Sequence, residues 1–256
     1  MRADPLRSSP DQVIGRYALF REIASGGMAA VHLARLMGPA GFSRVVAIKR
    51  LHPHLARDPE FLKMFVDEAR LAARVQHPNV VPTLDIVAEN GELFIVMEYV
   101  DGESLARLAR LASESGQRIP VPIVAAVMLG ALQGLHAAHE ARDEDGRPLE
   151  LVHRDISPQN VLVGVDGLPR VVDFGVAKAV GRSSQTSGGM LKGKLPYMSP
   201  EQLLLDPVDR RTDLYAVSIV LWEMLAGRRL FTGGNDWEIA SRNKGGILEP
   251  PSAHNP

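Results

Sequence analysis

Hydrophobic and polar positions divide the chain into a strand-rich first part and a helix-rich second part. Alternating patterns rich in β-branched and aromatic residues predict five strands, over Tyr17–Ile23, Ala30–Arg35, Val45–Leu51, Leu84–Val87 and Leu93–Tyr99. One helix is predicted among them. Asp58 can cap it and Pro59 suits its first position, and its apolar stripe consists of Leu62, Phe65, Ala69, Ala72 and Ala73. We expect this helix to end before Pro78.

The second part is predicted to be mainly helical. Helical periodicity covers Ser104–Ser113, Val121–Glu140, Glu201–Leu204 and Asp213–Ala226, with short strand-like pieces at Val161–Val163 and Arg170–Val172. Strands followed by helices indicate an α+β fold with two lobes. We expect a β-rich lobe over about residues 17–99, a hinge at about 99–102 and a helical lobe over about 103–256.

Composition narrows the classes of function. With 29 Lys and Arg against 30 Asp and Glu, the net charge of -1 gives no reason to expect nucleic acid or an anionic membrane as a partner. The absence of cysteine excludes a disulfide, a thiolate nucleophile and a cysteine zinc site, and it is consistent with the cytoplasm. Residues 1–16 are polar and predicted to be a disordered lead-in without a secretory signal. The most apolar segments fall short of the ~20 residues that span a bilayer, so no membrane segment is predicted.

Small residues form a turn between the first two strands. It contains Ala24, Ser25, Gly26 and Gly27. Without large side chains, backbone N–H groups in such a turn can approach phosphate groups. An ordinary hairpin turn has the same composition, so the turn alone does not distinguish the two interpretations.

Charged residues at fixed places along the chain indicate phosphate chemistry. Lys49 ends the apolar strand Val46–Lys49, and Glu68 on the following helix can form an ion pair that fixes its ammonium on phosphate oxygens. The segment His153–Asn160 places Asp155 and Asn160 in one loop, where a carboxylate can accept a proton and a carboxamide can bind a hard cation.

A second candidate metal-binding group, a carboxylate, follows the last short strand. It belongs to Asp173 in the sequence Asp173-Phe174-Gly175, and Ser199-Pro200-Glu201 comes later. The turn, the lysine and the Asp173-Phe174-Gly175 tripeptide are each weak alone, and only the His153–Asn160 spacing is informative by itself. The order of turn, lysine, glutamate and the two loops is specific.

In this order and spacing, the chain resembles the catalytic domain of eukaryotic-like, bacterial-type serine/threonine protein kinases from about Tyr17 to its carboxyl end. The resemblance implies a kinase-like fold that uses ATP and Mg²⁺, with Mn²⁺ as a substitute, to phosphorylate Ser or Thr of protein substrates. It implies that Lys49 binds the α- and β-phosphates and pairs with Glu68. Asp155 would handle the substrate hydroxyl, while Asn160 and Asp173 would hold the metal.

The resemblance also assigns residues to the nucleotide pocket and to the internal scaffold. Backbone groups of Glu98 and Val100 would bind adenine, with Met97 guarding the space behind it. The remaining assignments are Val31 and Ala47 over the adenine ring, Phe174 stacked on His153 to align the lobes, and Asp213 bracing the catalytic loop.

The chain departs from the family pattern at several positions. Ala24 and Ala29 replace two glycines of the phosphate loop, which leaves Gly26 at its centre. Ser157 replaces a catalytic-loop lysine, and Lys194 replaces a threonine. We therefore hypothesise a reciprocal exchange in which Lys194 and Ser157 serve catalysis. The family's last helices, one of which supplies an arginine that pairs with the residue matched by Glu201, are absent from this sequence.

Two other interpretations remain open. An ATP-binding pseudokinase that acts as a scaffold would explain the altered Ser157 and Lys194, although Lys49, Asp155 and Asp173 are all present. A small-molecule phosphotransferase would not need the peptide-docking segment Leu195–Glu201. A protein kinase would also be expected to self-associate for trans-autophosphorylation, for which Ser183, Ser184, Thr186 and Ser187 are the candidate sites.

Overall fold

The computed structural model describes residues 9–89, 91–174, 195–233, 238–239, 241 and 249–255. It divides the chain into two units, Met1–Ala73 with Pro82–Tyr99 and Arg74–Val81 with Val100–Pro256. The sequence predicts residues 17–99 as one lobe, whereas the structure assigns residues 74–81 to the second unit.

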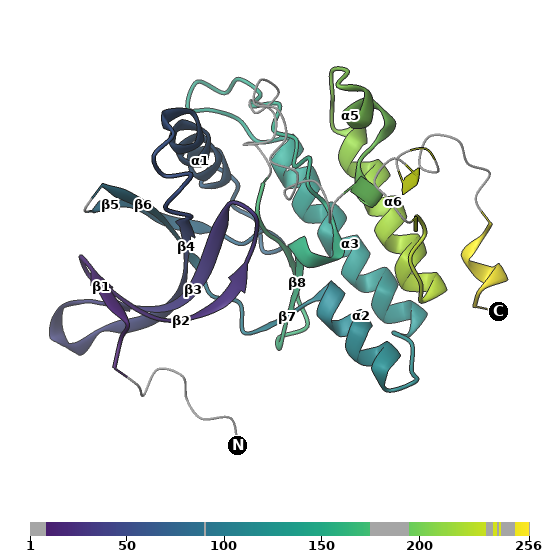
Figure 1. The fold of residues 1–256 in the computed structure, drawn as a ribbon, viewed down its shortest axis with the longest axis horizontal. Helices are drawn as coiled ribbons and strands as arrows, with labels where there is room; N and C mark the ends of the chain where they lie inside the picture. The colour runs from purple at the N-terminus through teal and green to yellow at the C-terminus, as the bar shows by residue number, and fades with distance from the viewer. Residues whose placement is uncertain are drawn as a thin grey trace. The chain divides into compact units, whose positions relative to one another are not determined.

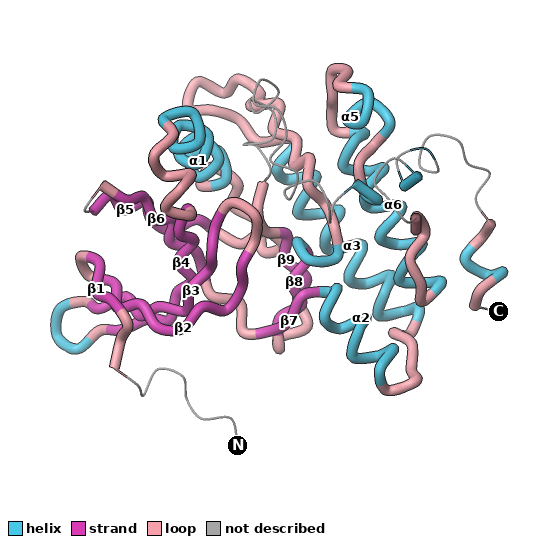
Figure 2. The backbone as a smooth tube through the Cα atoms, viewed as in Figure 1, coloured by secondary structure: helices cyan, strands magenta, loops and turns pink. Residues whose placement is uncertain are grey.

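The first unit contains a six-stranded antiparallel sheet (Figures 1 and 2). Its strands are β1 (Gln12–Ile14), β2 (Tyr17–Ser25), β3 (Ala29–Met37), β4 (Ser43–Leu51), β5 (Thr83–Glu89) and β6 (Glu92–Glu98), in the order β1-β2-β3-β4-β6-β5. A short 3₁₀ turn, η1 (Pro39–Gly41), lies between β3 and β4. All five predicted strands are therefore present.

Strand β1 corrects the prediction that residues 1–16 form a disordered lead-in. Gln12–Ile14 pairs with β2, and Ile14 is only 2% exposed in a core cluster with Tyr17 and Leu19. Three residues are too few to display a period of two, so the pattern of hydrophobic positions does not reveal this strand. Residues 1–8 lie outside the described part of the chain.

Helix α1 (Pro59–Ala72) forms for the reasons that the sequence predicts. The Asp58 side chain accepts a hydrogen bond from the Glu60 N–H at 2.9 Å, and Pro59 occupies the first turn. The helix ends before Pro78 and buries Met64 and Phe65 on one face. The same face also buries Glu68, an acidic side chain that requires a partner.

The second unit combines four described helices with a small antiparallel sheet. The helices are α2 (Leu105–Glu114), α3 (Val121–His139), α5 (Pro200–Leu204) and α6 (Arg211–Ala226), each within two residues of its predicted bounds. The sheet consists of β7 (Gly102–Ser104), β8 (Val161–Gly164) and β9 (Pro169–Val171). Short 3₁₀ turns are η2 (Pro158–Asn160), η4 (Leu195–Tyr197) and η5 (Pro251–Ala253).

Helices α3 and α6 pack side by side in the core of the second unit (Figure 1). Their buried residues include Leu135 on α3 and Val220 on α6. By length and composition alone, α3 is the one described helix that could cross a membrane, and it is longer than the apolar segment seen in the sequence. Its contacts with α6 and β9 are those of a core helix.

Close packing of α3 gives a testable prediction about stability. A Cβ atom at Gly130 would lie 2.3 Å from Pro169 Cγ and 2.9 Å from Asn79 Nδ2. Gly130→Ala should therefore lower the unfolding free energy by about 1–3 kcal/mol, although alanine is the better helix former. Urea denaturation would measure the change, with Ala125→Ser on the exposed side of the same helix as control. Equal midpoints for both variants would contradict the prediction.

Candidate functional site

The small-residue turn connects β2 to β3 at residues 26–28. The Gly26 N–H donates to the Ala29 carbonyl at 2.9 Å, and Gly26 and Gly27 are exposed. Ala24 and Ser25 belong to the end of β2, where they pair with Val31 and Ala30. The turn thus presents backbone rather than side chains to the solvent.

Lys49 and Glu68 form a largely buried ion pair. Lys49 Nζ lies 2.8 Å from Glu68 Oε1, and the two side chains are only 13% and 11% exposed. The lysine comes from β4 and the glutamate from the buried face of α1. Low exposure weakens screening by solvent, so the glutamate fixes the ammonium in place. The ion pair predicted from the sequence is therefore present.

One face of the first unit's sheet carries the residues that the sequence assigns to a nucleotide. Val31 lies opposite Lys49, and Met97 lies opposite Ala47. Residues directly opposite each other share a face, as do residues two apart on one strand. Val31, Ala47, Lys49 and Met97 therefore lie on the same face of the sheet.

The two residues predicted at the hinge belong to different units. Glu98 ends β6, its N–H donates to the Pro82 carbonyl at 3.1 Å, and its carboxylate pairs with Arg44 at 2.9 Å. Val100 begins the longer segment of the second unit.

In the second unit, Asp155 and Asn160 are joined directly. Asn160 Nδ2 donates to the Asp155 backbone carbonyl at 2.8 Å and to Asp155 Oδ2 at 3.1 Å. Both residues are buried. Because the amide nitrogen faces Asp155, the carboxamide oxygen of Asn160 is turned away from it and is suited to a hard cation.

Asp173 is attached to the same loop. The Val172 N–H donates to the Asn160 carbonyl at 3.1 Å. Asp173 is the next residue, so this hydrogen bond holds its backbone close to Asn160. Asp173 has φ of 59°, a left-handed conformation that is rare outside glycine and is often found at functional sites. Gly175 lies outside the described residues.

The side-chain oxygens of Asn160 and Asp173, which the sequence assigns to a metal, would suit Mg²⁺ better than a transition metal. Within the described ranges there is no group of three His, Cys, Asp or Glu side chains that could hold a metal. Magnesium commonly uses one or two protein oxygens together with phosphates and water, so this small set is sufficient.

Ser157 lies in the same loop with its hydroxyl enclosed. The residue is 1% exposed, and its Oγ has no hydrogen-bond partner within the described part of the chain. Lys194, its predicted counterpart, lies outside the described residues, as do Ser183, Ser184, Thr186 and Ser187. The reciprocal exchange therefore stays a prediction.

The His153 ring is buried in its neutral form and contacts the loop that carries Asp155. Its Nε2 donates to the Val172 carbonyl at 2.9 Å, its Nδ1 accepts from the Asp155 N–H at 3.3 Å, and its ring lies 4.8 Å from that of Phe174. A charged ring could not accept the second bond. Burial lowers the pKa of His153, and the carboxylates of Asp213 and Asp155 offset this effect only in part.

This burial predicts a pH dependence of stability. The pKa of His153 is lower in the folded protein than the ordinary ~6.5 of an unfolded chain, so protons bind preferentially to the unfolded chain. The associated stability is present above about pH 6.5 and is lost as the pH falls below it. The unfolding free energy measured from pH 7 to pH 5 should decrease more steeply for the unmodified chain than for His153→Phe. Parallel curves would contradict the assignment.

Asp213 accepts hydrogen bonds from the loop that carries Asp155. Its fully buried carboxylate accepts the N–H groups of His153 and Arg154 and the Nε2–H of His139, each at 2.8 Å. Arg154 has φ of 64°, so the loop backbone is held in a rare conformation. Sequence reasoning anticipated Asp213 but missed His139, for which no motif gives a signal.

Gln202 is a second contact that sequence reasoning missed. Its Nε2 donates to the Arg154 carbonyl at 2.9 Å, and its Oε1 accepts from the Ser199 N–H at 3.0 Å. Ser199 caps α5 in return, which forms a capping box. The spacing Ser199-x-x-Gln202 is the sequence signal that could have indicated this arrangement.

The segment predicted to dock a peptide is anchored on α6. The Tyr197 hydroxyl donates to Glu223 at 2.7 Å and accepts a hydrogen bond from Arg229. Burial raises the pKa of both Tyr197 and Glu223, so the phenol remains a donor at neutral pH. Leu195 and Pro196 are buried beside them.

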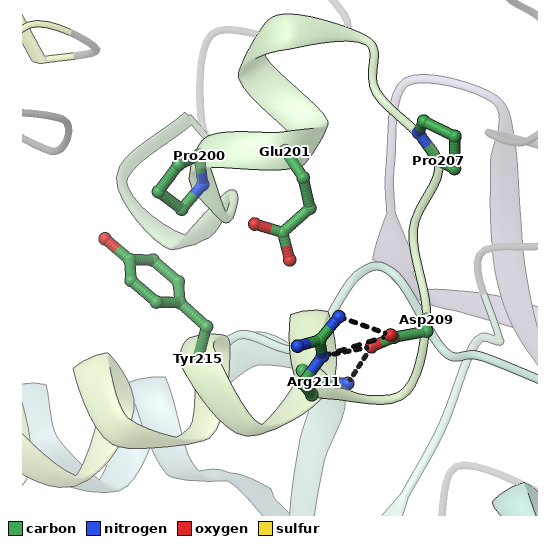
Figure 3. A pocket seen from close by; sticks show the side chains of 6 residues that line it. All are labelled: Pro200, Glu201, Pro207, Asp209, Arg211 and Tyr215. Carbon is green, nitrogen blue, oxygen red and sulfur yellow. Dashed lines mark hydrogen bonds and ion pairs between the residues drawn. The ribbon is translucent and has the colours of Figure 1, made fainter.

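Glu201 borders a hollow of about 410 Å³ on the second unit (Figure 3). The hollow is lined by Pro200, Glu201, Pro207, Asp209, Arg211 and Tyr215. Partial burial raises the pKa of Glu201, but the hydrogen bond from the Thr212 hydroxyl, at 2.7 Å, helps to bring it below its ordinary value. The glutamate is thus partly exposed and partnered.

Comparison with known proteins gives consistent similarities. Residues 17–251 match the family model described as protein kinase domain. The chain is 45% identical over 240 residues to the tyrosine-protein kinase MasK of Myxococcus xanthus, which covers 94% of the chain and 37% of that protein. It is 36% identical over 252 residues to the serine/threonine-protein kinase PknB of Mycobacterium tuberculosis, which covers 96% of the chain and 38% of that protein.

A solved structure is also similar. The crystal structure of the Mycobacterium tuberculosis PknI kinase domain has a TM-score of 0.67 and 28% identity, and the match covers 96% of the chain and 84% of that structure. These similarities confirm the predicted α+β class with a β-rich and a helical lobe. The chain spans little more than a third of the length of the two curated relatives named above.

Proposed function

Because the chain belongs to the protein kinase domain family, we propose that it transfers the γ-phosphoryl group of ATP to Ser or Thr hydroxyls of protein substrates. The observation that best supports this proposal is the hydrogen-bonded pair of Asp155 and Asn160. The pair combines a proton acceptor with an oxygen ligand for a cation in one braced loop. ATP as the phosphate donor is consistent with a cytoplasmic reaction.

Asp155 acts on the substrate hydroxyl in this proposal. The hydroxyl oxygen forms a bond to the γ-phosphorus, the bond from that phosphorus to its bridging oxygen breaks, and the hydroxyl proton passes to the Asp155 carboxylate. Lys49 neutralises charge on the phosphate oxygens, and Glu68 keeps its ammonium in position. Val31, Ala47 and Met97 supply an apolar face for adenine.

Asn160 and Asp173 would hold Mg²⁺, or Mn²⁺ in its place. When bound, the ion supplies positive charge that offsets the charge of the phosphates. The chain's own contribution is the placement of the two oxygen ligands, which the Val172 N–H bond to the Asn160 carbonyl fixes relative to each other.

Transfer of labelled phosphate to a generic basic protein tests this function. We expect label on phosphoserine and phosphothreonine, loss of label in Lys49→Met, and no loss in the control Lys63→Met, whose lysine is exposed on α1. The same reaction, analysed by mass spectrometry, tests autophosphorylation at Ser183, Ser184, Thr186 or Ser187 and its dependence on self-association. Label confined to phosphotyrosine would favour the activity named for MasK.

A pseudokinase scaffold is the second candidate, since Ser157 and Lys194 differ from the family pattern. It predicts ATP binding without transfer to any acceptor. A small-molecule phosphotransferase instead predicts transfer to a metabolite and none to protein, although the ordered contacts of Tyr197 with Glu223 favour a protein acceptor.

We further propose that Lys194 and Ser157 exchange the roles of the family's lysine and threonine. The buried Ser157 hydroxyl would then bond to the transferring phosphate or to the Lys194 ammonium. Lys194→Thr should abolish transfer, and adding Ser157→Lys should restore it. An unchanged rate for Lys194→Thr alone would contradict the exchange, and Lys63→Thr serves as control.

A further inference from the structure

His52 connects the small-residue turn to the strand that carries Lys49. Its ring Nε2 lies 2.8 Å from the Gly26 carbonyl oxygen, and its backbone N–H donates to the Met28 carbonyl at 2.9 Å. A carbonyl can only accept, so the Nε2 of His52 carries the proton. One residue therefore binds two of the carbonyls of the turn.

The backbone of His52 is itself held firmly. Its carbonyl accepts from the N–H groups of Leu55 and Ala56 at 2.9 and 3.0 Å, in the segment that leads into α1. The ladder of β3 and β4 continues up to it, since Ala29 pairs with Leu51. The His52 side chain thus extends to the turn from a backbone that is held by several hydrogen bonds.

The bond to Gly26 determines where a neighbouring donor points. The Gly26 carbonyl and the Gly27 N–H belong to one planar trans peptide, in which they point in opposite directions. Because His52 holds the carbonyl, the Gly27 N–H is directed away from His52. Within the described residues neither the Gly27 N–H nor the Met28 N–H has a hydrogen-bond partner.

We propose that His52 is a positioning residue that orients the Gly27 amide, next to the unpaired Met28 amide, toward the phosphates of a bound nucleotide. Unpaired backbone amides on adjacent residues of a turn bind anions. The methyl side chains of Ala24 and Ala29 cannot form a hydrogen bond to the turn, whereas the imidazole of His52 does. This inference rests on the proposed ATP binding and assigns a role to a residue outside the motifs.

Binding of ATP, ADP and adenosine by calorimetry tests the role. His52→Ala should weaken binding of ATP and ADP about fivefold to tenfold, as expected for one lost hydrogen bond, and leave adenosine binding unchanged. His52→Gln places an N–H donor close to the position of Nε2 and should restore affinity. His54→Ala is the control, because that exposed ring stacks on His52 at 5.8 Å without bonding to the turn.

Three outcomes would overturn the inference. Unchanged ATP affinity in His52→Ala would remove the role altogether, and equal losses for ATP and adenosine would indicate general damage instead of phosphate positioning. Failure of His52→Gln to restore affinity would exclude the donated hydrogen bond as the cause. If the unmodified chain bound no nucleotide, the proposed function itself would be contradicted, which separates the two failures.

Discussion

Replacing Asp155 with asparagine is expected to reduce phosphate transfer to a protein substrate by about a thousandfold, within the 10²–10⁴ range of general acid–base catalysis. The replacement keeps an oxygen that can accept the Asn160 Nδ2 hydrogen bond, now 3.1 Å long, so the loop should keep its shape. It removes the group that can take the hydroxyl proton. Single-turnover transfer of labelled phosphate would measure the change in the chemical step.

The control is an exposed carboxylate far from the loop in sequence. Glu60→Gln on α1 makes the same change from carboxylate to carboxamide and should leave the rate unchanged. ATP affinity should be retained in Asp155→Asn, which shows that the variant is folded. A rate within tenfold of the unmodified chain would exclude Asp155 as the proton acceptor, whereas the scaffold interpretation predicts no transfer by either protein.

Local signals in the sequence predicted most of the fold. Asp58 and Pro59 specify the start of α1, and long periodic segments specify α3 and α6, because these features act within a few residues of one another. Strand β1 was missed because its stability comes from pairing with β2 and from burial of Ile14, which a three-residue pattern does not reveal. Strand β7, which is also three residues long, was missed for the same reason.

The residues of the site were predictable where a motif fixes both residue type and spacing. Lys49, Glu68, Asp155 and Asn160 were all identified in this way, and the structure brings the first two and the last two together. The supporting contacts were not predictable, since His52 touches the turn through a backbone carbonyl that any residue supplies.

The contacts of Asp213 were also only partly predictable from the sequence. His139, the last residue of α3, donates to Asp213 on α6. In the sequence it lies well before the loop whose N–H groups bind the same carboxylate. Backbone donors such as the His153 and Arg154 N–H groups carry no sequence signal of their own. Only the folded chain shows that one carboxylate serves all three donors.

Asp213→Ala is therefore expected to have the largest effect on stability. It leaves three donors without an acceptor, the buried N–H of His153 and the partly buried donors of Arg154 and His139. An unsatisfied buried donor costs about 1–3 kcal/mol, and loss of a buried charged partner costs about 3–5 kcal/mol, a large part of a domain's ~5–15 kcal/mol. Urea denaturation should show this decrease together with loss of transfer. Asp209→Ala, which removes an exposed carboxylate just before the same helix, should shift the midpoint far less.

A double-mutant cycle of Asp213 and His139 separates the energy of their hydrogen bond from a simple loss of packing. His139→Ala alone removes one donor from Asp213, so its cost should be smaller than that of Asp213→Ala. In the double variant His139 no longer leaves an unpaired donor, so the two costs should be less than additive by about 1 kcal/mol or more. Strict additivity would mean that the 2.8 Å contact carries no energy. In that case the loop would be held without help from His139, which would then have no part in positioning Asp155.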